Sequence, residues 1–460
     1  ILAQTGYNDH QEGLLTAVSQ CLTTVLRQPA DSCTDTRRAA IVALVHATRV
    51  DGFIGGPLQR AAASEWDDAS HALVTLLTTL VTEDIDEIIQ LPADGLLTLL
   101  LEIQRTHPQV KIRSLVLEAW LTVQDVPTAE RHEHWRAPLI TRVTDTLLEA
   151  LAFPVEFTSW EDELNVDQSE FEEYRQLAPD VLVGCYNMLR VEFMQRLTQP
   201  LVVSSPTWTR QEATLYGLAA TARDVCGRLK TKVGGTQIMQ DKQATAALLQ
   251  QVAVTLCRAA PPSPTVATDS LCQFWGAYAA AWARIGSSEL ILQILEQLRV
   301  VLEQQQHAPT SQLSAAKAMK SVLSISAVRL TEDTSAMGTL LGLTQRLFSV
   351  AVVSNEEDVM MAVAEGCVRL VVQIKDPSVR DHALVALAQI LTEQAHKAVS
   401  AVPMDGSVLS EHAAAAVGAV VKFLQVLCVL IRFTQTESDN NGPHILTNTL
   451  NQFAWPFLEA

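Results

Sequence analysis

The sequence contains few of the residues that build β-structure and tight turns. Only 5% of its 460 residues are aromatic, and glycine (19) and proline (18) are sparse. The alternation of apolar and polar residues that marks a half-buried strand is almost absent. Leu, Ala and Val dominate the hydrophobic residues, which make up 48% of the sequence. This composition predicts an all-α protein, and the length predicts several domains or an elongated repeat rather than one core.

Basic residues are also scarce relative to acidic ones. The sequence has 33 Lys and Arg against 51 Asp and Glu, which gives a formal net charge of −18. Such a charge argues against nucleic acid or an anionic membrane as the main partner, because both are negatively charged. A basic protein partner is predicted instead.

Paired cysteines and long apolar runs are missing. The eight cysteines occur singly and never as CxxC, a pattern that favours buried free thiols in a reducing compartment over disulfides or a zinc site. The longest apolar stretch, residues 413–433, is interrupted by Lys422, Gln425 and Arg432, so we expect a buried core helix rather than a membrane span. No signal peptide opens the sequence, and its first residue is Ile1. We therefore expect a part of a longer polypeptide.

The local signatures of common catalytic sites are absent too. The sequence has no GxxxxGK[ST], GxGxxG, HExxH or GxSxG motif, so no cofactor, metal or enzymatic activity is predicted. The densest histidine cluster is RHEHWR, residues 131–136. Its His132 and His134 stand two apart and would point to different sides of a helix, which favours solvent-facing histidines over a metal site. Catalysis by carboxylates distant in sequence stays open.

Apolar residues recur at three- and four-residue spacing along most of the chain, and Pro, Gly, Asp or Ser bounds the segments. This period predicts amphipathic helices. The expected helices cover approximately residues 11–27, 35–49, 65–82, 95–106, 109–124, 129–152, 170–197, 208–229, 238–258, 266–285, 287–305, 310–329, 334–352, 356–373, 377–397, 408–433 and 443–457.

The spacing of these helices predicts a repeat architecture. About one helix pair falls in every fifty residues, close to the ~40 to 47 residues of a HEAT or armadillo unit. Residues 375–391, KDPSVRDHALVALAQIL, have the polar start, small residue and apolar stripe of a second HEAT helix. The predicted fold is an α-α superhelix, a HEAT-repeat solenoid. Residues 1–460 are expected to form one continuous array of about eight or nine pairs.

An acidic segment interrupts the helices between Phe153 and Tyr174. We expect an inter-helix loop at residues 154–170, and the segment has no Lys or Arg. One interpretation is an extended arm that binds a basic partner. The other is a solvated loop whose last acids complement the positive end of the next helix. The candidate cargo-binding residues are Glu161, Asp162, Glu163, Asp167, Glu170, Glu172 and Glu173, with Glu156 the eighth acid of the segment.

A second helix begins at Trp208. Trp208, Glu212 and Tyr216 follow one another at four-residue spacing and so share one side of it. A structural interpretation has Trp208 stapling the helix start and Glu212 bonding locally. The alternative is a binding role for this side of the helix.

Several motifs together resemble the middle of β-karyopherins of the transportin-3/importin-13 branch. They are FEEYRQLAPDVL (171–182), WTRQEATLYGLAATA (208–222), HPQVKIRSLVLEAW (107–120) and QLSAAKAMKSVLSISA (312–327). The likeness covers about residues 90–400 in the same order. Members of that family are superhelices of about twenty HEAT repeats, and they carry cargo through nuclear pores under the control of the GTPase Ran.

The resemblance implies a nuclear transport receptor that binds protein cargo on a HEAT-repeat arch and shuttles between nucleus and cytoplasm. The implied partners are a basic protein cargo, nucleoporins, and Ran through the full-length receptor. No direct nucleic acid or membrane partner is expected. The alternative function is a HEAT-repeat scaffold outside transport, such as a phosphatase scaffold, a coat or a tubulin-folding subunit.

Overall fold

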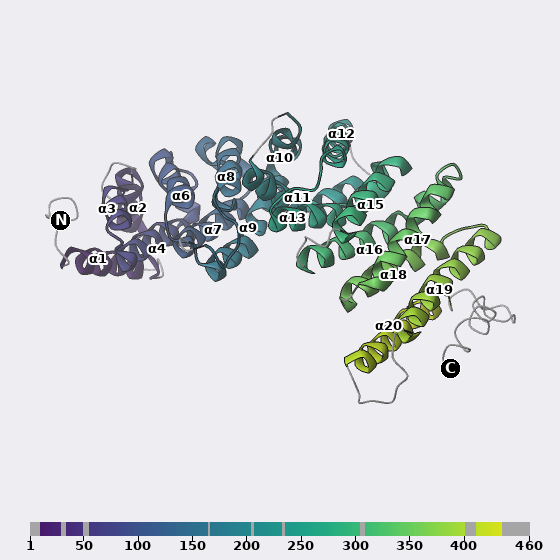
Figure 1. The fold of residues 1–460 in the computed structure, drawn as a ribbon. Coiled ribbons are helices and arrows are strands. Elements are labelled where there is room, and N and C mark those ends of the chain that lie inside the picture. Colours follow the sequence, from purple (N-terminus) through teal and green to yellow (C-terminus); the bar gives the residue numbers. More distant parts are fainter. Residues whose placement is uncertain are drawn as a thin grey trace. The chain divides into compact units, whose positions relative to one another are not determined.

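The structure is a computed structural model. It describes residues 10–28, 34–48, 55–163, 166–203, 207–231, 235–303, 309–354, 356–400 and 411–434. Every regular element within these ranges is helical (Figure 1), so the predicted all-α fold class is confirmed there. No helix in the described part of the chain combines the length and the apolar character needed to cross a bilayer.

The chain divides into two compact units, Ile1–Thr221 and Ala222–Ala460. The boundary falls inside helix α11 (Trp208–Lys230). Each unit is described by itself below. One continuous array over residues 1–460 stays a prediction.

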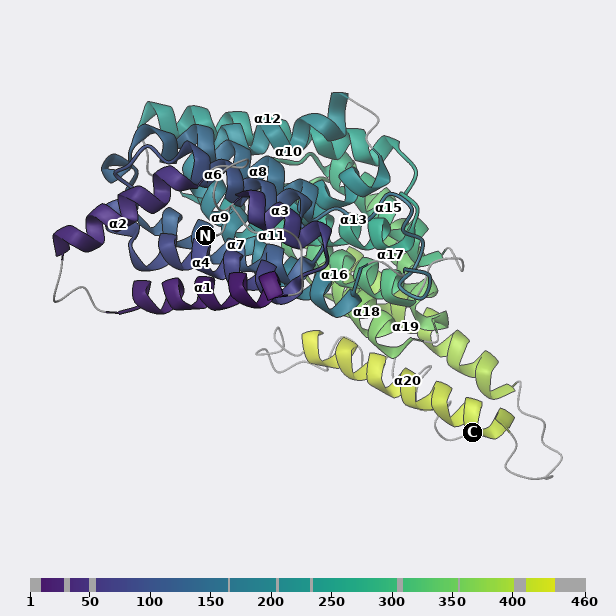
Figure 2. The same ribbon diagram turned by 90° about the vertical axis from the view of Figure 1, so that its left-hand side faces the viewer.

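The helices of the first unit form two layers (Figures 1 and 2). In one layer, α1 packs on α4, α4 on α7 and α7 on α9; in the other, α2 packs on α6 and α6 on α8. Contacts of α6 with α7 and of α8 with α9 join the layers, so each pair of consecutive helices is one structural repeat. The bounds are α1 His10–Leu26, α2 Thr34–Ala47, α3 Gly55–Ala63, α4 Asp67–Glu83, α5 Ile85–Ile88, α6 Asp94–Thr106, α7 Val110–Asp125, α8 Ala137–Ala150, α9 Gln168–Leu189 and α10 Val191–Val203.

The second unit repeats this arrangement. Helices α13, α16, α18 and α20 pack in sequence in one layer, and α12, α15, α17 and α19 do so in the other. Contacts of α15 with α16, α17 with α18 and α19 with α20 join the two layers. The bounds are α12 Thr236–Arg258, α13 Thr265–Ala277, α14 Ala279–Ile285, α15 Ser288–Glu303, α16 Pro309–Glu332, α17 Met337–Val353, α18 Glu357–Val372, α19 Pro377–Ser400 and α20 Glu411–Thr434.

Apolar stripes hold the layers together, and small residues set how closely the helices approach. On α19, Leu384, Leu387 and Leu391 are at most 2% exposed, as the apolar period predicts. Between α16 and α18, a Cβ atom built on Gly366 would lie 2.9 Å from the Cα atom of Lys320. These two backbones therefore meet at a distance that only glycine permits.

Most predicted helices are confirmed, with three corrections and two omissions. Helix α8 begins at Ala137 rather than near residue 129, because residues 128–130 and 133–135 form two short 3₁₀ helices. The predicted helix 170–197 is two helices, α9 and α10, and the predicted helix 266–285 is α13 and α14. The short helices α3 and α5 were not expected. The predicted helix 443–457 lies outside the described residues.

Both unexpected breaks occur where the apolar pattern continues from one helix into the next. Arg190, between α9 and α10, has a positive φ of 54°, which a helix cannot accommodate. Tyr278, between α13 and α14, has φ −91° and ψ 11°. Neither residue is a glycine or proline, so the sequence carries no local signal for either break.

Candidate functional site

An aromatic cluster fixes the start of the acidic segment to the helices around it. Phe153 lies 4.7 Å from Phe157 and 5.0 Å from Phe171 between ring centroids, and Phe157 lies 4.9 Å from Trp160. Trp208, the first residue of α11, contacts Phe153 and Phe157 at 6.1 and 6.4 Å. Phe153 and Phe157 are also buried. The aromatic side chains of the segment therefore hold the loop that carries the acids in place against the neighbouring helices.

A buried ion pair joins α9 to α11 beneath this cluster. Arg175 donates from Nη1 to Glu212 Oε2 at 3.1 Å and from Nη2 to Glu212 Oε1 at 2.5 Å. The two side chains are only 9% and 1% exposed. Nη1 of Arg175 also donates to the carbonyl of Leu151, so the pair connects α9 and α11 to the residue that follows α8. This bidentate geometry is the strongest form of the interaction.

Aromatic rings enclose the guanidinium of Arg175. Its Cζ atom lies 4.1 Å from the ring centroid of Tyr216 and 4.8 Å from that of Phe153. The Tyr216 hydroxyl donates to the main-chain carbonyl of Arg175. The bidentate partner of Glu212 thus lies on another helix, whereas the structural interpretation expected Glu212 to bond locally. Three of the residues that carry the family resemblance, Arg175, Glu212 and Tyr216, hold the fold together.

A second buried network surrounds Tyr174. Gln104 Nε2 donates to the Tyr174 hydroxyl at 3.1 Å, and Trp120 Nε1 donates to Gln104 Oε1 at 2.6 Å. Burial raises the pKa of Tyr174 to about 12. Helices α6, α7 and α9 are thereby linked through polar groups in an apolar interior.

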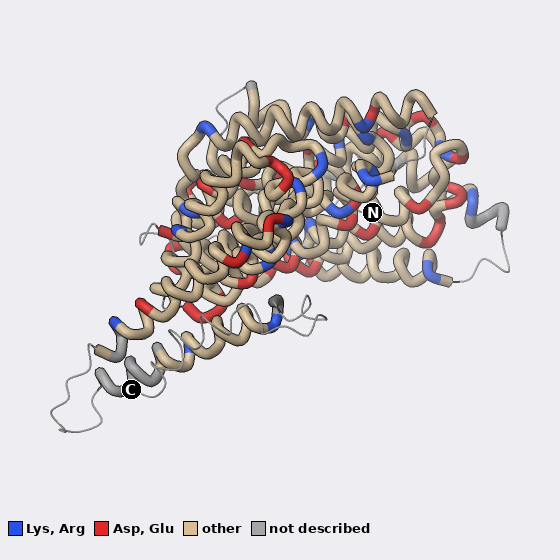
Figure 3. The backbone as a smooth tube through the Cα atoms, turned by 90° about the vertical axis from the view of Figure 1, so that its right-hand side faces the viewer, with Lys and Arg blue, Asp and Glu red and all other residues tan. Residues whose placement is uncertain are grey.

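The seven predicted cargo-binding acids fall on two neighbouring elements. The loop before α9 carries Glu161, Asp162, Glu163 and Asp167, and the first turns of α9 carry Glu170, Glu172 and Glu173. All are exposed except Glu163 and Glu170, which are half-buried. Their role in binding stays a prediction. Figure 3 shows that acidic residues also recur along the described helices and do not gather in this segment alone.

Two of these acids also form local hydrogen bonds. Asp162 accepts hydrogen bonds from the hydroxyls of Thr158 (3.1 Å) and Ser159 (2.7 Å). Asp167 is the N-cap of α9, and its Oδ1 accepts the backbone N–H of Glu170 at 2.9 Å. Asp167 therefore satisfies an otherwise unpaired donor at the helix start.

A cavity of about 380 Å³ lies within the first unit, where three inter-helix turns meet. Its lining comes from the α3–α4 turn, from the α6–α7 turn and from the start of α9. Four carboxylates belong to it, and only two of them, Asp167 and Glu170, were among the predicted acids. The others, Glu65 and Asp67, lie about a hundred residues earlier in the chain. The one cationic lysine or arginine of the lining is Lys111. We call this site the turn pocket.

His107 is a buried residue that lines the turn pocket. It is 7% exposed, and its Nδ1 accepts the backbone N–H of Gln109 at 3.2 Å. Burial lowers the pKa of His107, so the neutral ring predominates and carries its proton on Nε2. Within the described part of the chain, that Nε2 atom has no hydrogen-bond partner, nor does the side-chain oxygen of Gln109.

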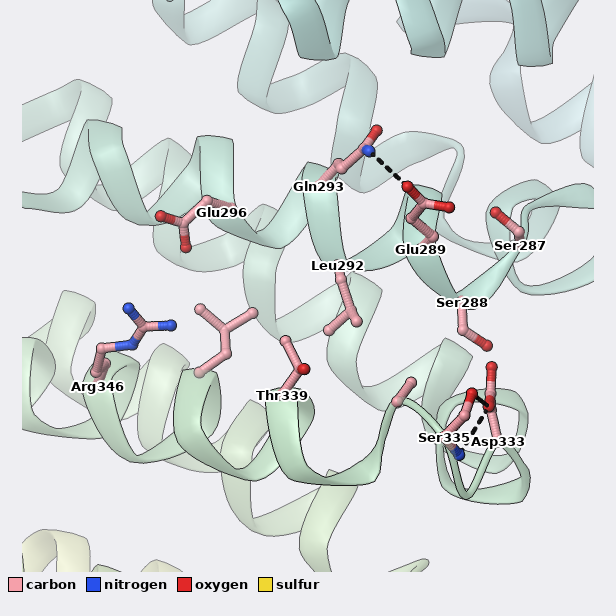
Figure 4. Close-up of a pocket in the computed structure, with 12 residues that line it drawn as sticks. Ser287, Ser288, Glu289, Leu292, Gln293, Glu296, Asp333, Ser335, Thr339 and Arg346 are labelled. Carbon is pink, nitrogen blue, oxygen red and sulfur yellow. Dashed lines mark hydrogen bonds between the residues drawn. The ribbon is translucent and has the colours of Figure 1, made fainter.

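A second, larger cavity of about 680 Å³ lies between α15 and α17 in the second unit (Figure 4). Glu296 of α15 and Arg346 of α17 face it from opposite sides. At its other end, Asp333 accepts the backbone N–H and the hydroxyl of Ser335 at 3.1 and 2.6 Å. These hydrogen bonds hold the pKa of Asp333 below its usual value. Two more of the lining residues pair with each other: Gln293 Nε2 donates to Glu289 Oε1 at 3.4 Å.

The predicted placement of His132 and His134 on different sides of a helix is wrong. Their rings meet edge to face with centroids 4.6 Å apart, because this segment forms 3₁₀ turns instead of an α-helix. His134 Nδ1 lies 3.0 Å from Asp94 Oδ1. Among the residues that the structure describes, no group of three or more His, Cys, Asp or Glu is placed to hold a metal ion.

The architecture of stacked helix pairs matches solved structures of karyopherins. The chain aligns with Kap121p bound to RanGTP at a TM-score of 0.57 and 13% identity, covering 98% of this chain and 41% of that one. Kap121p bound to the SUMO protease Ulp1p gives a TM-score of 0.54 at 13% identity, covering 98% and 40%. The fold is of the karyopherin type. The chain thus spans about two fifths of the length of these proteins.

Other comparisons add little to this result. Importin 13 in its cytosolic state matches with a TM-score of 0.39 and 14% identity, covering 100% of this chain and 65% of that one, a score too low to bear on the branch. No protein-family model matches the sequence, and the search of curated proteins gives no match.

Proposed function

We propose that this chain is part of an importin-β-like nuclear transport receptor, which binds protein cargo for Ran-regulated passage through nuclear pores. The observation that carries the proposal is the structural match to Kap121p in complexes with RanGTP and with Ulp1p, which extends over 98% of this chain. The order of the sequence motifs supports it independently. Its mechanism is binding, in which stacked repeats present a long surface to another macromolecule.

The charge of the chain supports a basic cargo. The formal net charge is −18, and aromatic packing holds in place the α8–α9 loop that carries the exposed acids. Many modest contacts with Lys and Arg side chains would give an affinity that falls as salt rises. Candidate cargo contacts are Glu161, Asp162, Glu163, Asp167, Glu170, Glu172 and Glu173.

The remaining partners belong to the full-length protein. Ran, nucleoporins and a shuttling distribution between nucleus and cytoplasm are proposed for that protein as a whole, since this chain covers 41% of Kap121p. Within the family we place it in the transportin-3/importin-13 branch. The support for the branch is the ordered motif pair at residues 171–182 and 208–222.

Direct binding of Ran to the full-length protein tests this proposal. Purified Ran loaded with GTP should bind, and Ran loaded with GDP should bind far more weakly. A HEAT-repeat scaffold outside transport would not distinguish Ran loaded with GTP from Ran loaded with GDP. Equal binding of both forms, or none of either, would therefore count against a transport receptor.

A further inference from the structure

We propose that an exposed apolar face of α20 is the docking site for another segment of this same chain, residues 443–457. The face consists of Val421, Leu424 and Cys428, and we call it the α20 stripe. The inference concerns the second unit alone. It goes beyond the proposed function, because it involves neither cargo nor Ran.

The α20 stripe is a second apolar face on a helix that already buries one. Val421 is 47% exposed, Leu424 is 39% exposed, and Cys428 is an exposed free cysteine. Their spacing of three and four residues places them along one side of the helix. Phe423 and Leu430, at most 2% exposed, belong to the side that packs into the core.

The helices packed on α20 leave the stripe exposed. Within the described residues, α20 is the last helix of its layer and packs mainly on α18 and α19 (Figure 1). Lys422 donates to the carbonyl of Ser354 at 3.3 Å, and Gln425 donates to Glu357 at 2.6 Å, so a third side of α20 faces the α17–α18 turn. A helix with apolar residues on opposite sides is ordinarily covered on both. We therefore expect a part of the protein outside the described residues to cover the α20 stripe.

The sequence that follows α20 contains a suitable partner. Residues 443–457, PHILTNTLNQFAWPF, lie outside the described part of the chain and contain no Asp, Glu, Lys or Arg, so their burial would desolvate no carboxylate, ammonium or guanidinium. Leu446, Leu450 and Phe453 recur at a spacing of four and three residues, and every residue between them is Thr, Asn or Gln. This period predicts an amphipathic helix with one narrow apolar face.

The two apolar faces match when the segment runs antiparallel to α20. From Cys428 backwards, the α20 stripe has steps of four and three residues, and from Leu446 forwards the segment has the same steps. Each face is therefore about 10 Å long. Residues 435–442 connect the two, and eight extended residues reach at most about 29 Å, which is enough to reverse the direction of the chain. Leu450 would then lie opposite Leu424.

The test measures how fast N-ethylmaleimide modifies Cys428 in the full-length protein, by mass spectrometry of the modified peptides. Leu450→Asn with Phe453→Asn removes the apolar face of the segment. Asn448→Ser with Asn451→Ser changes two residues on its opposite face and is the matched control.

A covered thiol reacts only when its cover opens, so Cys428 should react at least about tenfold faster in the apolar-face variant than in the unmodified protein. The control variant should change this rate by less than about twofold. Cys21, an exposed cysteine of the first unit, should react equally in all three proteins, and unchanged circular dichroism guards against misfolding.

Two results would overturn the proposal. Equal rates for Cys428 in the unmodified protein and in the apolar-face variant would show that the segment is not its cover, whether the thiol is open or protected in both. Protection of Cys428 that disappears on dilution would assign the α20 stripe to a second copy of the chain.

Disulfide trapping gives an independent measurement that leaves most of the apolar face intact. Under oxidation by oxidised glutathione, Leu446→Cys should form a disulfide with Cys428, because the antiparallel match places these two positions side by side. Asn448→Cys, on the opposite face of the segment, should not. Equal trapping of the two variants would contradict the placement of the segment.

Discussion

Among single residues, Glu212 is expected to matter most for stability. Changing Glu212→Gln leaves the Arg175 guanidinium buried without its carboxylate, and an uncompensated buried charge costs about 3 to 5 kcal/mol. The free energy of unfolding, measured from urea titrations followed by tryptophan fluorescence, should fall accordingly. Trp208 and Trp160, in the adjacent aromatic cluster, contribute to that signal.

Two further variants separate the buried pair from ordinary surface charges. Arg175→Met combined with Glu212→Leu should be less damaging than Glu212→Gln alone, because no charge stays buried. Lys375→Ala breaks an exposed pair with Glu332, at 2.9 Å and 71% and 55% exposure, and should cost less than about 1 kcal/mol. If Glu212→Gln cost no more than Lys375→Ala, the central role of the pair would be wrong.

The sequence predicted part of the candidate site, and there is a physical reason why the other residues of the site could not be predicted. Asp167 and Glu170 stood out because acids crowd between Phe153 and Tyr174 without a base. Glu65, Asp67 and His107 carried no such signal, because they join the site only through the stacking of distant turns. Arg175 and Glu212 were recognised as motif residues, yet the pairing of the two across 37 positions was not apparent from either segment alone.

At the level of helices, close packing through glycine gives the next prediction. Gly366→Ala in α18 would place a methyl group 2.9 Å from the Lys320 Cα atom of α16, and the two helices would have to separate. We expect a loss of about 1 to 3 kcal/mol in the free energy of unfolding. Gly342→Ala in α17 meets nothing within 4 Å and should gain about 0.5 to 1 kcal/mol. Urea unfolding followed by circular dichroism measures both, and changes of the same sign would contradict the packing described.

Helices were also the most predictable feature of the fold. The apolar period of three and four residues located nearly all of them, because each must bury one stripe against its neighbours. The breaks at Arg190 and Tyr278 were missed because burial continues across them: Leu189, Phe193, Phe274 and Trp282 are all buried. Periodicity reports which side chains are buried, and it does not report a change in the direction of the chain.

For the whole molecule, the expected property is electrostatic attraction to basic ligands. Reversing Glu161, Asp162 and Glu163 to Lys should weaken oligo-arginine binding severalfold at low salt, with a smaller difference at physiological salt. Thermal unfolding should hardly change, since the side chains are exposed or half-buried. Reversal of three other exposed acids of the first unit, Glu118, Asp125 and Glu149, is the control. An equal effect in the control would place the attraction in the overall charge and not in the acidic segment.

A transport receptor of the proposed kind exchanges its cargo against Ran. The most direct measurement is the release of a bound fluorescent oligo-arginine peptide from the full-length protein as Ran is added. If the protein is an import receptor of the proposed kind, Ran·GTP should release the peptide and Ran·GDP should not, because two ligands coupled through one protein lower each other's affinity by the same factor. A peptide that stays bound at saturating Ran·GTP would contradict the account.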